Sequence, residues 1–254
     1  MRGVRNKRRA ARWGAPLSHP RALLLSALLL AGGSRWALAD HLLTLRIEGP
    51  GGVPTEARLS VIGADSQSYR PLPDSISLFF EPLGGYFYAD SSAAMHVPAG
   101  PTRIRASKGL EFRSIDTTVA VVSDTVIVAA MERWIEPRSQ GLVGGDVHAH
   151  LLHDPVVYHP DEAAAARVVR AEGLRVAHFL DNGYLFTGQV SAHCDTTATF
   201  FCSEEYRSPI FGHLSLLGID SLLLPFGGSL GWPLNAEVVE RARGHAHSLA
   251  TYAH

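Results

Sequence analysis

The chain has 254 residues, of which 46% are hydrophobic and 19% charged, and its formal net charge is −1. This composition excludes an intrinsically disordered chain, and the length suffices for one large domain or two ordinary ones. Residues 1–39 carry eight Arg or Lys and no acid, which leaves 15 bases against 24 acids in residues 40–254. This acidic body argues against a nucleic-acid partner, because binding to phosphates requires clustered cations.

The first 39 residues have the order of a secretory signal peptide. Six basic residues between 2 and 12 precede the apolar run 22–31, and Ala-Leu-Ala at 37–39 supplies the small residues of a cleavage site. The apolar run is too short for a comfortable membrane span. We therefore expect cleavage before Asp40, a periplasmic or secreted protein, and no stable membrane span afterwards. An uncleaved anchor is the alternative.

Residues 40–135 have the pattern of short strands separated by turns. Leu43, Leu45 and Ile47 alternate with polar residues, so one face of this strand is expected to be buried. Turns rich in glycine and proline follow at 49–52, 71–74, 83–85 and 98–101. We predict a small antiparallel β-sandwich over 40–135. Its segment 97–109 resembles the final hairpin of transthyretin-like or carboxypeptidase-regulatory-like modules.

From residue 141 to 254 the pattern is that of an α/β domain. Pro160 and Asp161 begin a predicted helix that ends at Gly173, and residues 174–180 have the pattern of a buried strand. Strand, helix and strand in this order indicate parallel pairing. A second helix is expected at 237–243, before a strand that carries His254.

Two histidines, His148 and His150, lie in the sequence GGDVHAH at 144–150. In a strand, residues i and i+2 point to the same face, so both imidazoles can bind one divalent metal ion. Further acids and histidines follow at later strand ends: Asp181, Glu205, His213 and His254. We expect these side chains to gather, because functional groups of parallel α/β sheets lie at the carboxyl ends of the strands.

Each of these residues also has a purely structural interpretation. His148 and His150 can be solvent-exposed residues on one face of a strand. Asp181 can stabilise the Asp-Asn-Gly turn that it begins. Glu205 can be a surface acid, with its neighbour Glu204 as the rival ligand. His213 can be a buried histidine that is bonded to a backbone carbonyl.

Three other residues of this domain are interpreted as structural. Cys194 and Cys202 lie eight residues apart. In an exported protein we expect them to form a disulfide that closes a short excursion of the chain. His178 lies in the middle of the strand 174–180, where a core histidine is favoured over a functional one.

The order of these motifs resembles the polymerase-and-histidinol-phosphatase (PHP) superfamily and, within it, the carbaryl-hydrolase-like CehA/McbA branch. The matching pieces are GGDVHAH, the unit from 171 to 181, EEYRSPIFGHLSLLG at 204–218 and YAH at 252–254. The resemblance implies a multidomain chain, in which a small antiparallel β-sandwich precedes the N-terminal part of a PHP-type α/β (distorted β/α) barrel over 141–254.

The resemblance also implies a di- or trinuclear centre of zinc, manganese or iron, with Glu205 bridging two ions. The implied metal ligands are His148, His150, Asp181, Glu205, His213 and His254. Asn182 stands where family members commonly have a histidine, which puts the third metal in doubt. The late Asp-x-His pair of the family has no counterpart before residue 254, so we interpret the chain as a fragment.

The function implied is that of an exported metal-dependent hydrolase, which activates water against a phosphoester, amide or carbamate bond of a small-molecule or phosphoester substrate. No separate catalytic residue is assigned, because Ser215 lies outside any Gly-x-Ser-x-Gly motif. The alternative is a non-catalytic exported binding protein with a degenerate or incomplete metal domain. The sequence leaves the oligomeric state open.

Overall fold

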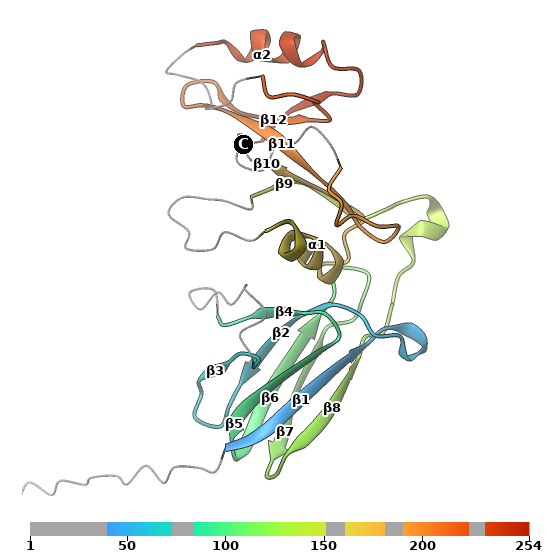
Figure 1. Ribbon diagram of the computed structural model, residues 1–254, viewed down its shortest axis with the longest axis vertical. Coiled ribbons are helices and arrows are strands. Elements are labelled where there is room, and N and C mark those ends of the chain that lie inside the picture. The colour runs from blue at the N-terminus through green and yellow to red at the C-terminus, as the bar shows by residue number, and fades with distance from the viewer. Residues whose placement is uncertain (1–39, 73–83, 151–160, 181–189, 224–231, 254) are drawn as a thin grey trace, which may run out of the picture. The chain divides into compact units, whose positions relative to one another are not determined.

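The computed structural model describes residues 40–72, 84–150, 161–180, 190–223 and 232–253 (Figure 1). Within these ranges the chain forms strands β1–β13 and helices α1 and α2. The predicted signal peptide and its cleavage site lie in residues 1–39, outside the described ranges.

Residues 40–130 form two sheets around one core. The first has the order β5-β1-β8, with β5 at Ser92–Pro98, β1 at Asp40–Glu48 and β8 at Thr125–Ala130. The second contains β3 (Ser68–Tyr69), β2 (Ala57–Ile62), β6 (Gly100–Ser107) and β7 (Ile115–Val121), with β4 (Phe87–Ala89) beside β2. β1 is antiparallel to β5 but parallel to β8, so the expectation of purely antiparallel pairing is wrong here.

Alternation of side chains builds the core between these two sheets. Leu43, Leu45 and Ile47 of β1 are fully buried, as predicted from their spacing. Leu59 and Val61 of β2 belong to the same cluster and come from the other sheet. Each such side chain stabilises the fold by about 1.5–3 kcal/mol relative to an exposed position.

The segment 97–109 is not a hairpin, so the resemblance to the final hairpin of transthyretin-like modules is wrong. β5 pairs with β1, whereas β6 pairs with β2 and β7 in the other sheet. The chain crosses from one sheet to the other at Gly100, whose φ of 133° is a conformation that side chains disfavour. A Cβ atom there would also lie 2.8 Å from the Cβ of Ala64.

The second part of the chain contains one mixed sheet with the order β13-β12-β11-β10-β9. The strands β9 (Gly145–Ala149), β10 (Val176–Leu180) and β11 (Thr199–Ser208) are parallel, as predicted for the first two. The strands β12 (Gly212–Leu217) and β13 (Leu249–Tyr252) are antiparallel to their neighbours.

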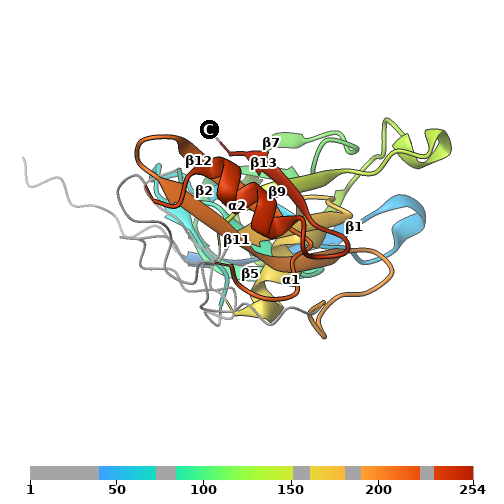
Figure 2. The ribbon, with the colours of Figure 1, turned by 90° about the horizontal axis from the view of Figure 1, so that it is seen from above.

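Helices α1 (Glu162–Ala171) and α2 (Asn235–Ala242) pack against strands of this sheet. The Asp161 side chain accepts a hydrogen bond from the Ala164 amide at 2.8 Å, and Gly173 follows the helix with a φ of 65°, so both predicted ends of α1 are confirmed. Helix α2 lies across β11 and β12 (Figure 2), and Val238 packs in the cluster that contains Tyr206. No helix among the described residues is long and apolar enough to cross a membrane.

The PHP-type barrel predicted for residues 141–254 is wrong. Such a barrel alternates strands with helices so that its strands run parallel. Here β11 returns directly as β12 through a short hairpin, and the three strands β11, β12 and β13 are antiparallel. In this part of the chain, the described residues contain two α-helices and five strands, and the strands form one open sheet that ends at β9 and β13. The assignment to the PHP superfamily falls with the barrel.

Lys108 is a buried cation that contacts α1. Its Nζ donates hydrogen bonds to the carbonyl oxygens of Glu56 at 2.9 Å and Arg170 at 2.8 Å. Burial lowers the pKa of this lysine below its ordinary value, although Glu56 acts in the opposite direction. The contact with Arg170 places positive charge at the C-terminal turn of α1, where the helix dipole favours it.

We expect Lys108→Met to lower the free energy of unfolding by about 2–3 kcal/mol, because two buried carbonyl oxygens lose their donor. Chemical denaturation followed by circular dichroism measures this change. The matched control is Arg113→Met, since the ion pair of Arg113 with Glu132 at 3.6 Å is exposed and contributes about 0.5 kcal/mol or less. Equal losses in the two variants would contradict the role of Lys108.

Candidate metal centre

The candidate centre lies at the carboxyl ends of the parallel strands. His148 is in β9 and His150 directly follows it, while Glu205 lies in β11. A register shift in the pairing of β9 with β10 occurs just before His150. The His148 amide donates to Asp146 Oδ1 at 2.9 Å, which fixes the backbone at the first imidazole. The predicted convergence of histidines and acid at this edge therefore occurs for these three residues.

Adjacent strands β11 and β12 supply the rest of the centre. Glu205 is opposite Ser215 in the register, and Arg207 is opposite His213. Because side chains at i and i+2 share a face, all four side chains stand on one face of this antiparallel pair. The hairpin is closed by Gly212, whose φ is 85°.

Three donor groups approach one another closely. The ligand atoms of His148, His150 and Glu205 all lie within 4.8 Å of one another. The two Nε2 atoms are 3.1 Å apart, and Glu205 places Oε1 3.7 Å from the first and Oε2 3.5 Å from the second. The carboxylate is almost completely buried, with 2% of its side chain exposed. Within the described part of the chain, this is the one such group of three.

The hydrogen bonding of His150 prepares it to bind a cation. Its Nδ1 lies 2.9 Å from the carbonyl oxygen of Leu180, at the end of β10. A carbonyl only accepts, so Nδ1 carries the proton and the neutral ring presents a lone pair at Nε2. Burial lowers the pKa of His150, against the attraction of Glu205, and so favours this neutral form. Histidine ligands of metal ions commonly have a carbonyl partner of this kind.

His148 has a corresponding partner on β12. Its Nδ1 lies 3.4 Å from the hydroxyl oxygen of Ser215. Because Nδ1 of His150 carries the proton, its Nε2 accepts, so His148 Nε2 donates the hydrogen bond between the two nitrogens and Ser215 Oγ donates to His148 Nδ1. An ion bound between the two nitrogens would replace that proton. The contact also brings together the side chains of β9 and β12, which are separated by two strands in the sheet order.

Two donors hold the Glu205 carboxylate in place. Arg207 Nε donates to Oε2 at 2.7 Å, and His213 Nδ1 donates to Oε1 at 2.9 Å. Burial raises the pKa of Glu205, but the hydrogen bonds from Arg207 and His213 outweigh burial and hold the pKa below its ordinary value. The carboxylate is therefore ionised and oriented toward the two imidazoles.

The geometry fits a divalent transition-metal ion. Donors bound tetrahedrally at roughly 2.0–2.1 Å from zinc are about 3.3 Å apart. The two nitrogens of this centre are 3.1 Å apart, and each lies 3.5 or 3.7 Å from a different oxygen of the Glu205 carboxylate, so all three separations are close to that value. Two imidazoles and one carboxylate are a donor set that suits zinc, manganese or iron. Three protein donors leave further coordination positions for water or another ligand.

The remaining predicted ligands have different positions. His213 contacts Glu205 through Nδ1 and is not one of the three converging donors. Glu204, the rival of Glu205, points to the opposite face of β11, where its fully buried carboxylate accepts from the Leu223 amide at 2.6 Å. Asp181 and His254 lie outside the described residues.

The structure does not join Cys194 to Cys202, and the predicted disulfide stays a prediction. Cys194 Sγ instead accepts a hydrogen bond from the Phe200 amide at 3.1 Å, which ties the loop before β11 to the strand. His178 is half-buried and lies outside the core cluster that holds its neighbours Ala177 and Phe179, so its interpretation as a core residue stays a prediction. Its Nδ1 lies 2.9 Å from Ser203 Oγ, its ring stacks on Phe201, and burial lowers its pKa.

Sequence reasoning missed three groups that support the centre. The Leu180 carbonyl belongs to the backbone, so no residue type signals its role. Ser215 was considered only as a nucleophile, whereas it contacts His148. Arg207 lies two residues after Glu205 on a strand, and this spacing alone already places both side chains on one face.

No protein-family model matches the chain, and no curated protein matches it. Among solved structures, the minor pilin GBS52 of Streptococcus agalactiae has a TM-score of 0.28 at 10% identity, covering 40% of this chain and 48% of that one. The pilus-presented adhesin Spy0125 (Cpa) has a TM-score of 0.26 at 13% identity, covering 39% of this chain and 28% of that one. The chain thus spans less than half of either structure, and these TM-scores are too low to carry an argument.

The hydrolase function was inferred from the PHP resemblance, and the fold removes that support, so hydrolysis stays a prediction. What stands independently of any family is the local arrangement of His148, His150 and Glu205. The chemistry of the chain must therefore be argued from these side chains.

Proposed function

We propose that the chain is an exported metal-binding protein that holds one divalent transition-metal ion through His148, His150 and Glu205. The observation that carries the proposal is the convergence of two imidazole nitrogens and a buried carboxylate, with Nδ1 of His150 already bonded to a carbonyl. Zinc, manganese and iron are the ions that this donor set suits.

Export is part of the same proposal. It rests on the basic, apolar and small-residue order of the first 39 residues, which is typical of a secretory signal. The periplasm or the extracellular space is the proposed location. A metal ion held by two imidazoles and a carboxylate is compatible with such a compartment, because none of these ligands is sensitive to oxidation.

Hydrolysis is a second and separate proposal, and it rests on the open coordination positions alone. The side chains of His148 and His150 are 26% and 15% exposed, so water can reach these two donors. A bound divalent ion would lower the pKa of a coordinated water and polarise the oxygen of a phosphoester, amide or carbamate. The competing proposal is a binding protein that holds the ion without turnover.

The experiment is a metal titration of the purified chain against a chromophoric chelator, with the bound ion counted by mass spectrometry. We expect one zinc, manganese or iron ion per chain in the wild type and none in the double variant His148→Ala, His150→Ala. Circular dichroism of the double variant controls for folding. A wild-type chain that binds no ion, or a folded double variant that binds as the wild type does, would overturn the proposal. Turnover of 4-nitrophenyl esters by the loaded wild type alone would support hydrolysis, and its absence would favour the binding protein.

A further inference from the structure

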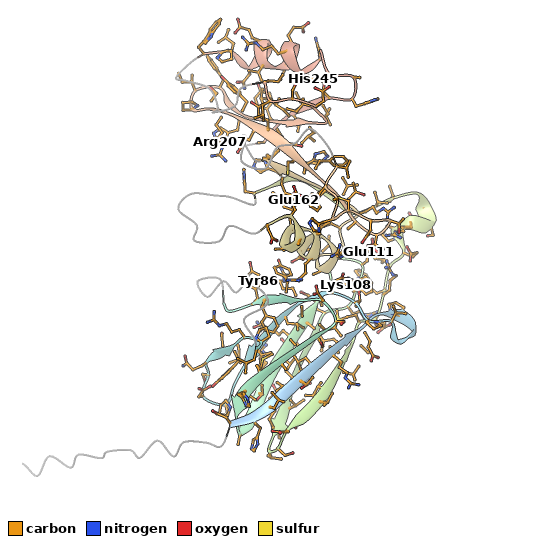
Figure 3. The ribbon with its side chains drawn as sticks, viewed as in Figure 1. Tyr86, Lys108, Glu111, Glu162, Arg207 and His245 are labelled. Carbon is orange, nitrogen blue, oxygen red and sulfur yellow. The ribbon has the colours of Figure 1, made fainter. Side chains whose placement is uncertain are left out.

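Arg207, labelled in Figure 3, is a residue of β11 that contacts the Glu205 carboxylate of the candidate centre. Its Nε donates to a carboxylate that is 2% exposed, whereas its own side chain is 41% exposed. The guanidinium is therefore bound at Nε by a buried carboxylate, while part of the Arg207 side chain is exposed to solvent. Glu205 is its one hydrogen-bond partner among the described residues, and that bond uses Nε alone.

Arg103 and Arg207 differ in the number of guanidinium nitrogens that donate to a carboxylate. Arg103 donates through both Nε and Nη2 to the exposed carboxylate of Asp116, so its planar fork is already occupied by an anion. At Arg207 the two terminal amino groups make no such bidentate pair among the described residues. A guanidinium fork in this state matches the oxygens of a phosphate or a carboxylate.

The distances place this fork next to any ion in the centre. Glu205 Oε2 is 3.5 Å from His150 Nε2 and accepts from Arg207 Nε at 2.7 Å. An ion bound to Oε2 at roughly 2.0–2.2 Å would thus lie within about 5 Å of Nε. A single anionic group can span that separation, with one oxygen toward the ion and another toward Arg207.

Charge acts in the same direction. Two neutral imidazoles, one carboxylate, one guanidinium and a divalent ion sum to a net charge of about +2 in a partly enclosed site. Such a site attracts anions and disfavours cations.

We infer that Arg207 is the anion-recognising residue of this centre, and that the exogenous ligand of the bound ion carries an oxyanion, either a phosphate or a carboxylate. This inference rests on the proposed metal binding. Arg207 has two functions in it: Nε holds Glu205 toward the ion, and the terminal amino groups receive the ligand.

The test is a calorimetric titration of inorganic phosphate, and separately of acetate, into the cobalt-loaded chain, with visible absorption reporting ligand exchange at the ion. We expect the wild type to bind at least one of the two anions, and we expect Arg207→Gln to bind that anion at least about tenfold more weakly. Both proteins should retain the metal ion. Arg207→Lys keeps the charge but loses the planar fork, so an intermediate affinity is expected. Tighter binding of phosphate identifies a phosphoester-type ligand, and tighter binding of acetate identifies a carboxylate.

The matched control is Arg243→Gln, which removes one positive charge at an exposed ion pair with Glu240 and should leave anion affinity unchanged. Anion binding by Arg207→Gln equal to that of the wild type would overturn the inference, as would a loaded wild type that binds neither anion. Loss of the ion from both Arg207 variants would assign the residue to holding Glu205 only, and would also overturn it. A wild-type chain that holds no cobalt refutes the metal centre itself, and is thereby distinguished from these outcomes.

Discussion

Glu205→Gln is expected to weaken metal binding by about 100-fold, because it removes the one anionic donor that the described residues bring to the centre. The amide keeps the shape of the side chain and one oxygen that can accept from Arg207 or His213. The amide also places an N–H group against one of these two donors and loses the interactions that favour the charged form, so we expect the free energy of unfolding without metal to fall by about 1–3 kcal/mol. Chelator competition measures the affinity, and chemical denaturation measures the stability.

The neighbouring substitution Glu204→Gln provides the control, and we expect this variant to keep its affinity for the metal ion. Glu204 is fully buried on the other face of β11 and accepts from the Leu223 amide. An amide group there introduces N–H donors into a site built for an acceptor, which should lower the free energy of unfolding by about 1–3 kcal/mol. Metal affinity of the folded variant should stay within a factor of a few of the wild type. If Glu204→Gln loses the ion and Glu205→Gln keeps it, the assignment of the ligand is wrong.

Gly218→Ala should be the most destabilising single methyl addition in the sheet that carries the centre. Gly218 follows β12 with a φ of 66°, and a Cβ atom there would lie 2.4 Å from the carbonyl oxygen of His247. The turn before β13 would have to move, and β13 pairs directly with β12. We expect a loss of about 3–5 kcal/mol, from left-handed backbone strain and from the close approach together.

The control for this prediction is Gly141→Ala. Gly141 has a φ of 71°, but a Cβ atom there would meet no other atom within 4 Å. Its loss should be about 1–2 kcal/mol, the cost of left-handed backbone alone. Thermal or chemical denaturation of the two variants separates strain from crowding. Equal losses would show that the approach of His247 is not what makes residue 218 a glycine.

Features with local causes could be predicted from the sequence. Leu43, Leu45 and Ile47 are buried because alternation along a strand depends only on neighbouring residues. Asp161 and Gly173 bound α1 because a side-chain acceptor and a residue tolerant of positive φ act within one turn of the helix. The pair His148 and His150 follows the same two-residue period.

Features that depend on distant pairing could not be predicted. Nothing local to 97–109 says that β5 and β6 join different sheets, because each strand has equally good partners elsewhere. The hairpin of β11 and β12 resembles, in sequence alone, two strands of a barrel. This one difference in connection replaces a parallel arrangement by an antiparallel one and removes the PHP family from consideration.

The choice between Glu204 and Glu205 lies between these two cases. Both are acids in the same strand, and a strand of period two must send them to opposite faces. The register of β11 against β12 places Glu205 opposite Ser215, which contacts His148. Glu205 therefore lies on the face of the sheet that carries the histidines. The sequence could therefore predict that one of the two acids joins the centre, but the register selects which.

Among the described residues, β9 is the outermost strand of its sheet because it pairs with β10 alone, and it carries His148 and directly precedes His150. An outermost strand has fewer neighbours to keep it in place and is prone to fraying. A cation shared between this strand and β11 spans the intervening β10 and would act as a clasp. Metal binding and the ordering of β9 would then be linked in one equilibrium. The concentration of metal ion around the protein would determine how far this strand is ordered.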